Sequence, residues 1–186
     1  MATKPLDNEI IEKIISSIFL PQDVRNALLI ELNTGLRIMD IAKLKFSQIQ
    51  FGILELVEQK TKKTQITKIN MDLVRYLNTN KTWSGDYMFL EAKRKRNGIE
   101  YCAPKSFVRY VQNKLKIVCE CEHINHEFIS THSFRKTFAT NAFNQTKDLV
   151  FVQKLLNHSS VSITQRYINV DQERIDNFRE KIKMGF

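Results

Sequence analysis

The stretch from Thr131 to Val170 limits the possible folds of this chain more than any other segment. Its apolar residues recur at the spacing of amphipathic helices: Phe134, Phe138, Phe143, Val150, Val152, Leu155 and Leu156. Polar residues with reactive or charged side chains stand between them: His132, Arg135, His158 and Tyr167. The pattern predicts helices that give one face to a core and present these polar side chains from the rest of their surface.

The composition indicates a compact domain whose natural partner is a polyanion. With 186 residues, of which 42% are hydrophobic, the chain can build one sizeable core. Its formal net charge of +9 favours nucleic acid as the first candidate partner and an anionic membrane surface as the second.

Nothing in the sequence predicts a membrane or secreted protein. No segment has the roughly 20 apolar residues of a membrane span, and the opening MATKPLDNEI lacks the apolar core of a signal peptide. Three cysteines suit a reducing compartment and give no disulfide framework. We therefore expect a cytoplasmic protein with no membrane partner.

The N-terminal part predicts three consecutive helices. Isoleucines at helical spacing mark the first, from Asp7 to Ile18. Pro21 opens the second, which ends near Gly35. The third covers residues 36–49.

Arg37 and Asp40 are three residues apart, so the third helix would place them on one face. A surface ion pair is one interpretation. The apolar neighbours of Arg37 favour a functional role, because a charge in such surroundings needs a partner.

Residues 51–70 alternate in polarity and are rich in β-branched side chains, which predicts a β-hairpin. Its tip carries three lysines: Lys60, Lys62 and Lys63. An ordinary solvated turn and a basic finger that reaches a nucleic-acid backbone are both compatible with this pattern.

The middle of the chain predicts further short elements: a helix over Met71–Leu77, a brief strand over Tyr87–Leu90 and a long helix from Pro104. Between the last two lies a basic run that we expect to be a flexible loop and a phosphate contact: Lys93, Arg94, Lys95 and Arg96. The fold class is therefore mainly α with a small antiparallel β-hairpin or sheet.

A zinc site is an alternative use of four residues that lie within eight positions: Cys119, Cys121, His123 and His126. Structural zinc sites use wider pairings, and residues at i and i+2 point apart on a helix. This spacing disfavours a metal-binding regulator.

Two arginines, two histidines, a lysine and a tyrosine are suited to attack on a phosphodiester. Guanidinium groups bind phosphate oxygens in a bidentate manner and keep their charge. A phenol needs a proton acceptor, which an imidazole provides, and the departing sugar oxygen needs a proton, which a lysine provides. Because the cations belong to the chain, we expect no metal and no cofactor.

Three segments, TGLRIMDIAKL, HSFRKTFAT and LLNHSSVSITQRY, resemble the tyrosine recombinase (phage-type integrase) family in order and separation. The resemblance covers about Pro5 to Tyr167 and implies a tyrosine recombinase catalytic-domain-like fold. It implies site-specific recombination of double-stranded DNA, as in mobile elements, through a 3′-phosphotyrosyl intermediate.

The resemblance also implies roles for individual residues. Arg37 and Arg135 would clamp the scissile phosphate, and His132 would handle the proton of the nucleophile Tyr167. His158 would hydrogen-bond the phosphate. The supporting acid would be Asp40.

The family's catalytic lysine lies in a hairpin turn, and EQKTKKTQI matches that turn best with Lys60 in the role. Lys62 and Lys63 remain candidates and otherwise contact DNA, together with the basic run and Lys136. Asn157 stands where many members have glycine, and we expect little consequence.

We expect a catalytic domain over residues 1–170 and a helical tail over residues 171–186, with no N-terminal core-binding domain. The family implies a homo-tetramer on DNA whose subunits exchange such tails. Docking of the tail in cis is equally compatible, and the chain free of DNA can be a monomer. The alternative function is a catalytically inactive DNA-binding accessory or regulatory protein. Neither the DNA site nor the outcome of recombination can be read from the sequence.

Overall fold

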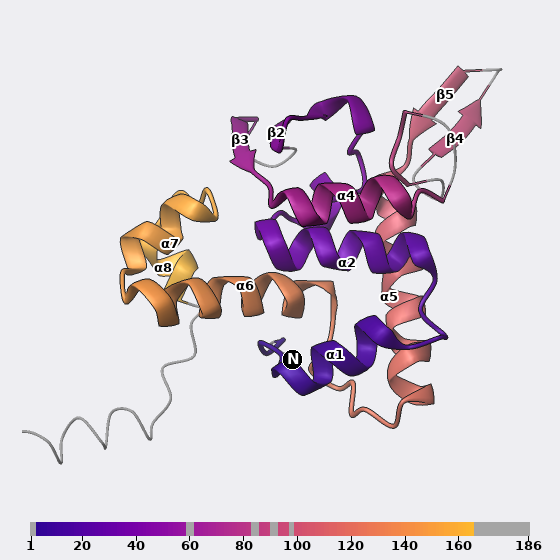
Figure 1. Cartoon of the computed structure of the whole chain (residues 1–186). Coiled ribbons are helices and arrows are strands. Elements are labelled where there is room, and N and C mark those ends of the chain that lie inside the picture. The colour runs from indigo at the N-terminus through magenta and orange to yellow at the C-terminus, as the bar shows by residue number, and fades with distance from the viewer. Residues whose placement is uncertain (1–2, 59–61, 83–85, 90–92, 97–98, 166–186) are drawn as a thin grey trace, which may run out of the picture. The chain divides into compact units, whose positions relative to one another are not determined.

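The computed structural model describes residues 3–58, 62–82, 86–89, 93–96 and 99–165 (Figure 1). The chain divides into two compact units, residues 1–138 and 139–186. The expected tail over residues 171–186 lies outside the described residues, as do Lys60 and Tyr167.

Helices form most of the first unit. They are α1 (Asn8–Ser16), α2 (Gln22–Thr34), α3 (Ile38–Ile41), α4 (Met71–Thr79), α5 (Pro104–Cys121) and the first half of α6 (Thr131–Thr146). The inner face of α5 presents Phe107, Val111 and Val118, all of which are fully buried. The ring of Phe89 packs on Phe107 with 4.7 Å between their centroids. The periodicity that predicted these helices therefore marks the core-facing residues correctly.

The first helix is shorter than predicted. It ends at Ser16, and Ile18 is 87% exposed, so the prediction that Ile18 extends the apolar face is wrong. Ser17 Oγ donates to Glu122 Oε1 at 2.6 Å and accepts from the N–H of Phe19 at 3.2 Å. These bonds give the backbone an alternative to another helical turn.

The predicted third helix is mostly absent. In its place α3 is followed by the 3₁₀ helix η1 (Phe46–Gln48) and the strand β1 (Ile49–Gln50). The chain leaves the helix because Phe46 donates its N–H to Asp86 O at 2.8 Å and Leu44 O accepts from Met88 at 2.8 Å. These pairings with a distant segment override the local helical periodicity.

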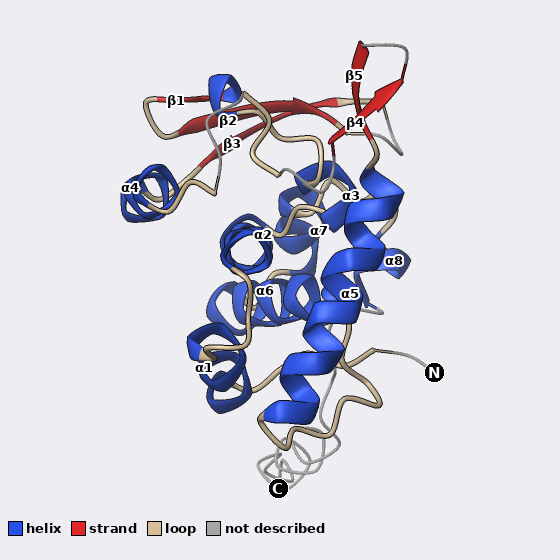
Figure 2. Ribbon diagram, turned by 90° about the vertical axis from the view of Figure 1, so that its right-hand side faces the viewer, coloured by secondary structure: helices blue, strands red, loops and turns tan. Residues whose placement is uncertain are grey.

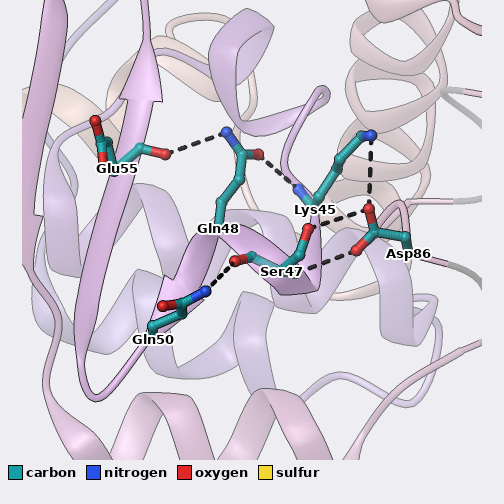
Figure 3. Close-up of polar contacts among 6 residues, drawn as sticks. All are labelled: Lys45, Ser47, Gln48, Gln50, Glu55 and Asp86. Atoms are coloured by element: carbon teal, nitrogen blue, oxygen red, sulfur yellow. Dashed lines mark hydrogen bonds and ion pairs between the residues drawn. The ribbon is translucent and has the colours of Figure 1, made fainter.

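Asp86 anchors this segment with its side chain as well (Figure 3). Its carboxylate accepts from Ser47 N at 3.2 Å and from Ser47 Oγ at 3.1 Å, and Lys45 Nζ lies 3.5 Å away. Gln48 then ties the segment to the sheet, since it donates through Nε2 to Glu55 O at 3.1 Å. The sheet that carries the basic tip is thus fastened at its base.

The predicted hairpin is present as β2 (Ile53–Val57) and β3 (Thr64–Lys68). Its antiparallel register pairs Ile53 with Lys68 and Val57 with Thr64. The strand β1 adds to β2, so the sheet has the order β1-β2-β3. Leu54 and Leu56 point into the core, which fixes this register. Figure 2 shows the sheet at the end of the first unit opposite α1.

The basic run is a strand rather than the flexible loop that we predicted. Lys93–Arg96 forms β4 and pairs with β5 (Ile99–Cys102) in an antiparallel register. The sequence between them, Asn97-Gly98, is a strong two-residue hairpin signal, which the charge of the run concealed. The strand predicted over Tyr87–Leu90 is wrong: within its described part Tyr87 forms an isolated bridge with Lys45.

The second unit contains the end of α6 (Thr131–Thr146), α7 (Leu149–Leu155) and α8 (Val161–Gln165). Asp148 caps α7 by accepting from the N–H groups of Val150 and Phe151 at 2.8 and 3.0 Å. Val152 is buried as expected, whereas Val150 is 49% exposed and does not belong to the core. The fold class is mainly α with small antiparallel sheets, as predicted. No helix in the described part of the chain has the length and apolarity to cross a bilayer.

Candidate active site

Arg37 follows the turn that ends α2. Gly35 caps that helix in the left-handed conformation, at φ 63°, and its N–H donates to Glu31 O at 2.9 Å. On either side of Arg37, Leu36 and Ile38 are both 1% exposed, and they fasten the segment to the core. Arg37 itself is the N-cap of α3 and keeps part of its side chain accessible.

The ion-pair partner of Arg37 is Glu58, not the residue that helical spacing suggests. Arg37 Nη1 donates to Glu58 Oε2 at 2.9 Å, and the Glu58 side chain is 1% exposed. Arg37 is the N-cap of α3, immediately before its first helical residue, and its ion pair in the described part of the chain is with Glu58. Asp40 is buried, and its N–H donates to Arg37 O at 2.8 Å.

Arg135 approaches the same turn from a distant part of the chain. It lies on α6 and is 1% exposed, and its Nη1 donates to the carbonyl oxygen of Gly35. A helix C-terminus carries partial negative charge on such carbonyl groups, which suits a buried guanidinium. The two arginines are thus fixed on one turn, Arg37 by its place in the chain and Arg135 by this bond.

His132 stands one helical turn before Arg135 on α6 and is exposed. Its pKa is lowered from the ordinary 6.5, mainly by desolvation and then by the positive charges of Arg135, Lys136 and Arg37. These cations therefore lie close enough to the imidazole to act on its charge. In the first unit the structure brings together the predicted residues Arg37, His132 and Arg135.

Lys136, predicted to contact DNA, donates through Nζ to Thr3 O. Partial desolvation lowers its pKa. The bond fastens the N-terminal segment to α6.

Glu31 is a buried acid that belongs to no motif in the sequence. It is fully buried on α2, and neither of its carboxyl oxygens has a well-formed hydrogen bond in the described part of the chain. Burial raises its pKa well above 4.5, while the charge of Arg135 and the nearby Ile38 N–H oppose the rise. A raised pKa means that the folded protein keeps this carboxyl uncharged to a higher pH than it does an exposed glutamate.

Replacing Glu31 with leucine is expected to raise the free energy of unfolding by about 1–3 kcal/mol, because a buried polar group without hydrogen bonds is costly. Since the folded-state pKa of Glu31 is raised, the folded state holds the extra proton, and wild-type stability falls as pH rises from about 4.5. Urea unfolding between about pH 5 and pH 8 measures this decline, which Glu31→Gln should reduce.

The matched control is Glu12→Gln on the exposed face of α1. We expect it to change neither the stability nor its pH dependence. A pH profile of Glu31→Gln that parallels the wild type would contradict the proposed burial of an ionisable carboxyl.

The hairpin lysines fall at the edge of the described residues. Lys62 has a positive φ of 59° and donates its N–H to Glu58 O at 3.0 Å. The side chains of Lys62 and Lys63 are exposed.

The second unit positions His158. Its ring is buried, with Nδ1 3.0 Å from Thr164 Oγ1, and its backbone is bonded to Gln153. Asn157, before it, has φ 52°. Asparagine tolerates this left-handed conformation, which accounts for its presence where many family members have glycine. The contact with Thr164 was not anticipated from the sequence.

The possible zinc ligands do not converge. Cys119 is buried, and desolvation raises its pKa to about 11, whereas Cys121 is exposed. The described residues include no group of three or more His, Cys, Asp or Glu arranged to hold a metal ion. His126 Nε2 instead lies 3.5 Å from Glu120 Oε1.

Two arginines on one turn, with a histidine whose pKa their charge lowers, form a cationic cluster of the kind that can bind a phosphate. The model of the phage integrase family matches residues 4–174. The chain therefore belongs to the phage integrase family, the tyrosine recombinases, and the match identifies their catalytic domain.

Individual relatives agree with this assignment. A probable integrase/recombinase of Bacillus subtilis, YoeC, is 31% identical over 147 residues, which cover 76% of this chain and 75% of YoeC. The tyrosine recombinase XerA of Pyrococcus horikoshii is 28% identical over 189 residues, 97% of this chain and 62% of XerA. The chain thus spans less than two thirds of the XerA relative.

Solved structures share the fold. A crystal structure of XerA recombinase matches with a TM-score of 0.71 at 19% identity, over 98% of this chain and 66% of that one. A lambda integrase (75–356) dimer bound to a COC′ core site matches with a TM-score of 0.69 at 20% identity, over 100% of this chain and 64% of that one. The predicted family and fold class are confirmed.

Proposed function

We propose that the chain catalyses site-specific recombination of double-stranded DNA by breaking and rejoining strands through Tyr167. The observation that carries the proposal is the pair of arginines held at one turn, with Arg135 bonded to the Gly35 carbonyl and Arg37 two residues beyond it. Two guanidinium groups at one place match the charge of a phosphodiester that is under attack.

In the proposed reaction, the Tyr167 hydroxyl gives its proton to His132 and its oxygen attacks the scissile phosphorus. The bond from phosphorus to the 5′ oxygen breaks, and Lys60 gives that oxygen a proton, so a 5′-hydroxyl leaves. The product is a 3′-phosphotyrosyl ester. Attack by the 5′-hydroxyl of another strand reverses these transfers and reseals the DNA.

The protonation of His132 suits this role. Because its pKa is lowered, the imidazole is mainly neutral at pH 7 and can accept the phenol proton. His158 would donate from Nε2 to a phosphate oxygen if the Thr164 hydroxyl donates to Nδ1, since that bond selects the required tautomer.

The rate of cleavage is expected to rise with pH, with a midpoint below 6.5, and to be flat above about pH 7. His132→Asn should remove this rise and slow cleavage by about 10²-fold. Single-turnover cleavage across pH measures both effects. His126→Asn is the control, and an equal loss in both variants would contradict the role of His132.

The proposal also covers how the chain is divided, how its subunits assemble on DNA and which residues contact the DNA phosphates. Residues 1–170 would act as the catalytic domain and residues 171–186 as a tail exchanged within a tetramer on DNA. The exposed Lys62 and Lys63 and the basic strand β4 would contact phosphates. The binding constant should then fall steeply with salt, because phosphate contacts release counterions.

The proposed function is tested by incubating the protein with sheared DNA of its own host and isolating the protein that becomes covalently attached. Wild-type protein should become covalently attached to a defined site, which sequencing of the trapped DNA identifies, and Tyr167→Phe should not. If neither protein becomes attached while both bind duplex DNA, the inactive DNA-binding alternative is correct.

A further inference from the structure

Glu58 occupies a position that links two parts of the site. It follows the last residue of β2, Val57, and is 1% exposed, whereas Val57 is 60% exposed. Its carboxylate reaches Arg37 Nη1 at 2.9 Å. A charged side chain just past the end of a strand is usually solvated, so burial of this one against an arginine needs an explanation.

The backbone of Glu58 closes the turn of the hairpin. Its N–H donates to Lys63 O at 3.0 Å, and its carbonyl accepts from Lys62 N at 3.0 Å. The main chain of Glu58 therefore bonds to the described residues Lys62 and Lys63, while its side chain holds the guanidinium of Arg37.

The geometry leaves Arg37 free to bind an anion. Within the described residues its guanidinium makes one hydrogen bond, through Nη1, and the side chain remains 18% exposed. A planar guanidinium held along one edge has a fixed orientation, and its other N–H groups remain available to a phosphate.

We propose that Glu58 is a positioning residue that orients Arg37 toward the scissile phosphate. The inference rests on the proposed function and adds a residue that acts through Arg37, not on the DNA. Loss of the carboxylate would let the guanidinium rotate and would leave its remaining charge without a counter-ion. Small errors in the position of a catalytic group have large effects on rate.

The test is a double-mutant cycle. Its substrate is a suicide duplex, which holds the protein in the covalent intermediate, and it carries the DNA site identified by the trapping experiment. Glu58→Gln, which keeps the shape of the side chain, should slow single-turnover cleavage by about 10–100-fold with DNA affinity within about threefold of the wild type. In an Arg37→Ala background the same change should alter the rate by less than about threefold, because the residue it positions is gone.

The control is Asp72→Asn. Asp72 Oδ1 pairs with Arg75 Nη2 at 2.7 Å, but both side chains are exposed. The same change of charge there should leave cleavage unaffected.

A second variant is used if Glu58→Gln fails to fold. Glu58→Asp keeps the charge on a shorter side chain, and its cleavage rate should also fall.

A wild-type cleavage rate in folded Glu58→Gln would overturn the inference. So would effects of Glu58→Gln and Arg37→Ala on the cleavage rate that simply multiply in the double variant. Either result leaves the proposed function standing, because the wild type still forms the adduct. If the wild type forms none, the proposed function fails and this inference fails with it.

Discussion

Replacement of Arg135 with lysine is expected to slow DNA cleavage by about 10²–10³-fold while duplex binding survives. The guanidinium of Arg135 already donates to Gly35 O and is 1% exposed, so in the proposed reaction it must hold this carbonyl and the phosphate together. A lysine has one ammonium group and cannot reproduce the planar fork. Single-turnover cleavage of a suicide duplex measures the effect.

Arg25 supplies the matched control, because it too binds backbone carbonyl groups beside a helix end. Its Nη2 donates to Ser17 O at 2.8 Å and to Leu20 O at 3.3 Å, at the end of α2 away from Gly35. Arg25→Lys should lower the melting temperature by an amount similar to Arg135→Lys but leave cleavage intact. Equal losses of activity would show that Arg135 acts only through folding.

Lys60→Ala is expected to slow cleavage by about 10²–10⁴-fold, because the departing 5′ oxygen would lose its proton donor. The loss should largely disappear when sulfur replaces that oxygen in the substrate, since a thiolate leaves without a proton. The measurement compares the cleavage rates of the wild type and Lys60→Ala on the oxygen substrate and on the sulfur substrate.

Lys62→Ala and Lys63→Ala are the controls within the same turn. Both side chains are exposed, and Lys62 is bonded to Glu58 through its backbone, which the substitution retains. We expect them to weaken DNA binding without a sulfur-specific rescue. A rescue of Lys62→Ala or Lys63→Ala but not of Lys60→Ala would move the role of proton donor to that residue.

Local patterns predicted much of the fold. Regular periodicity identified α2, α5 and the hairpin β2–β3, because burial of one face determines both the pattern and the structure. The prediction failed for residues 36–49, where hydrogen bonds to Asp86 and Met88 divide a helical pattern into α3, η1 and β1. Such distant partners leave no periodic signal.

The candidate site was predictable as a set of residue types but not as a network. Arg37 has a charged partner, as its apolar neighbours predict, but that partner is Glu58, 21 positions away in the sequence. The bond from Arg135 goes to a main-chain carbonyl, that of Gly35, which no side-chain motif encodes. Glu31 lies in an apolar helical run, and the sequence does not distinguish it from its neighbours. Only the structure does so, through its full burial and its charge interaction with Arg135.

Identification of the residue that carries the DNA tests the central proposal most directly. The wild-type adduct on a suicide duplex is digested with protease and nuclease, and the modified peptide is sequenced by mass spectrometry. We predict a nucleotide joined through its 3′ phosphate to Tyr167, and no adduct in Tyr167→Phe. A nucleotide on another residue, or an adduct that persists in Tyr167→Phe, would contradict the proposal.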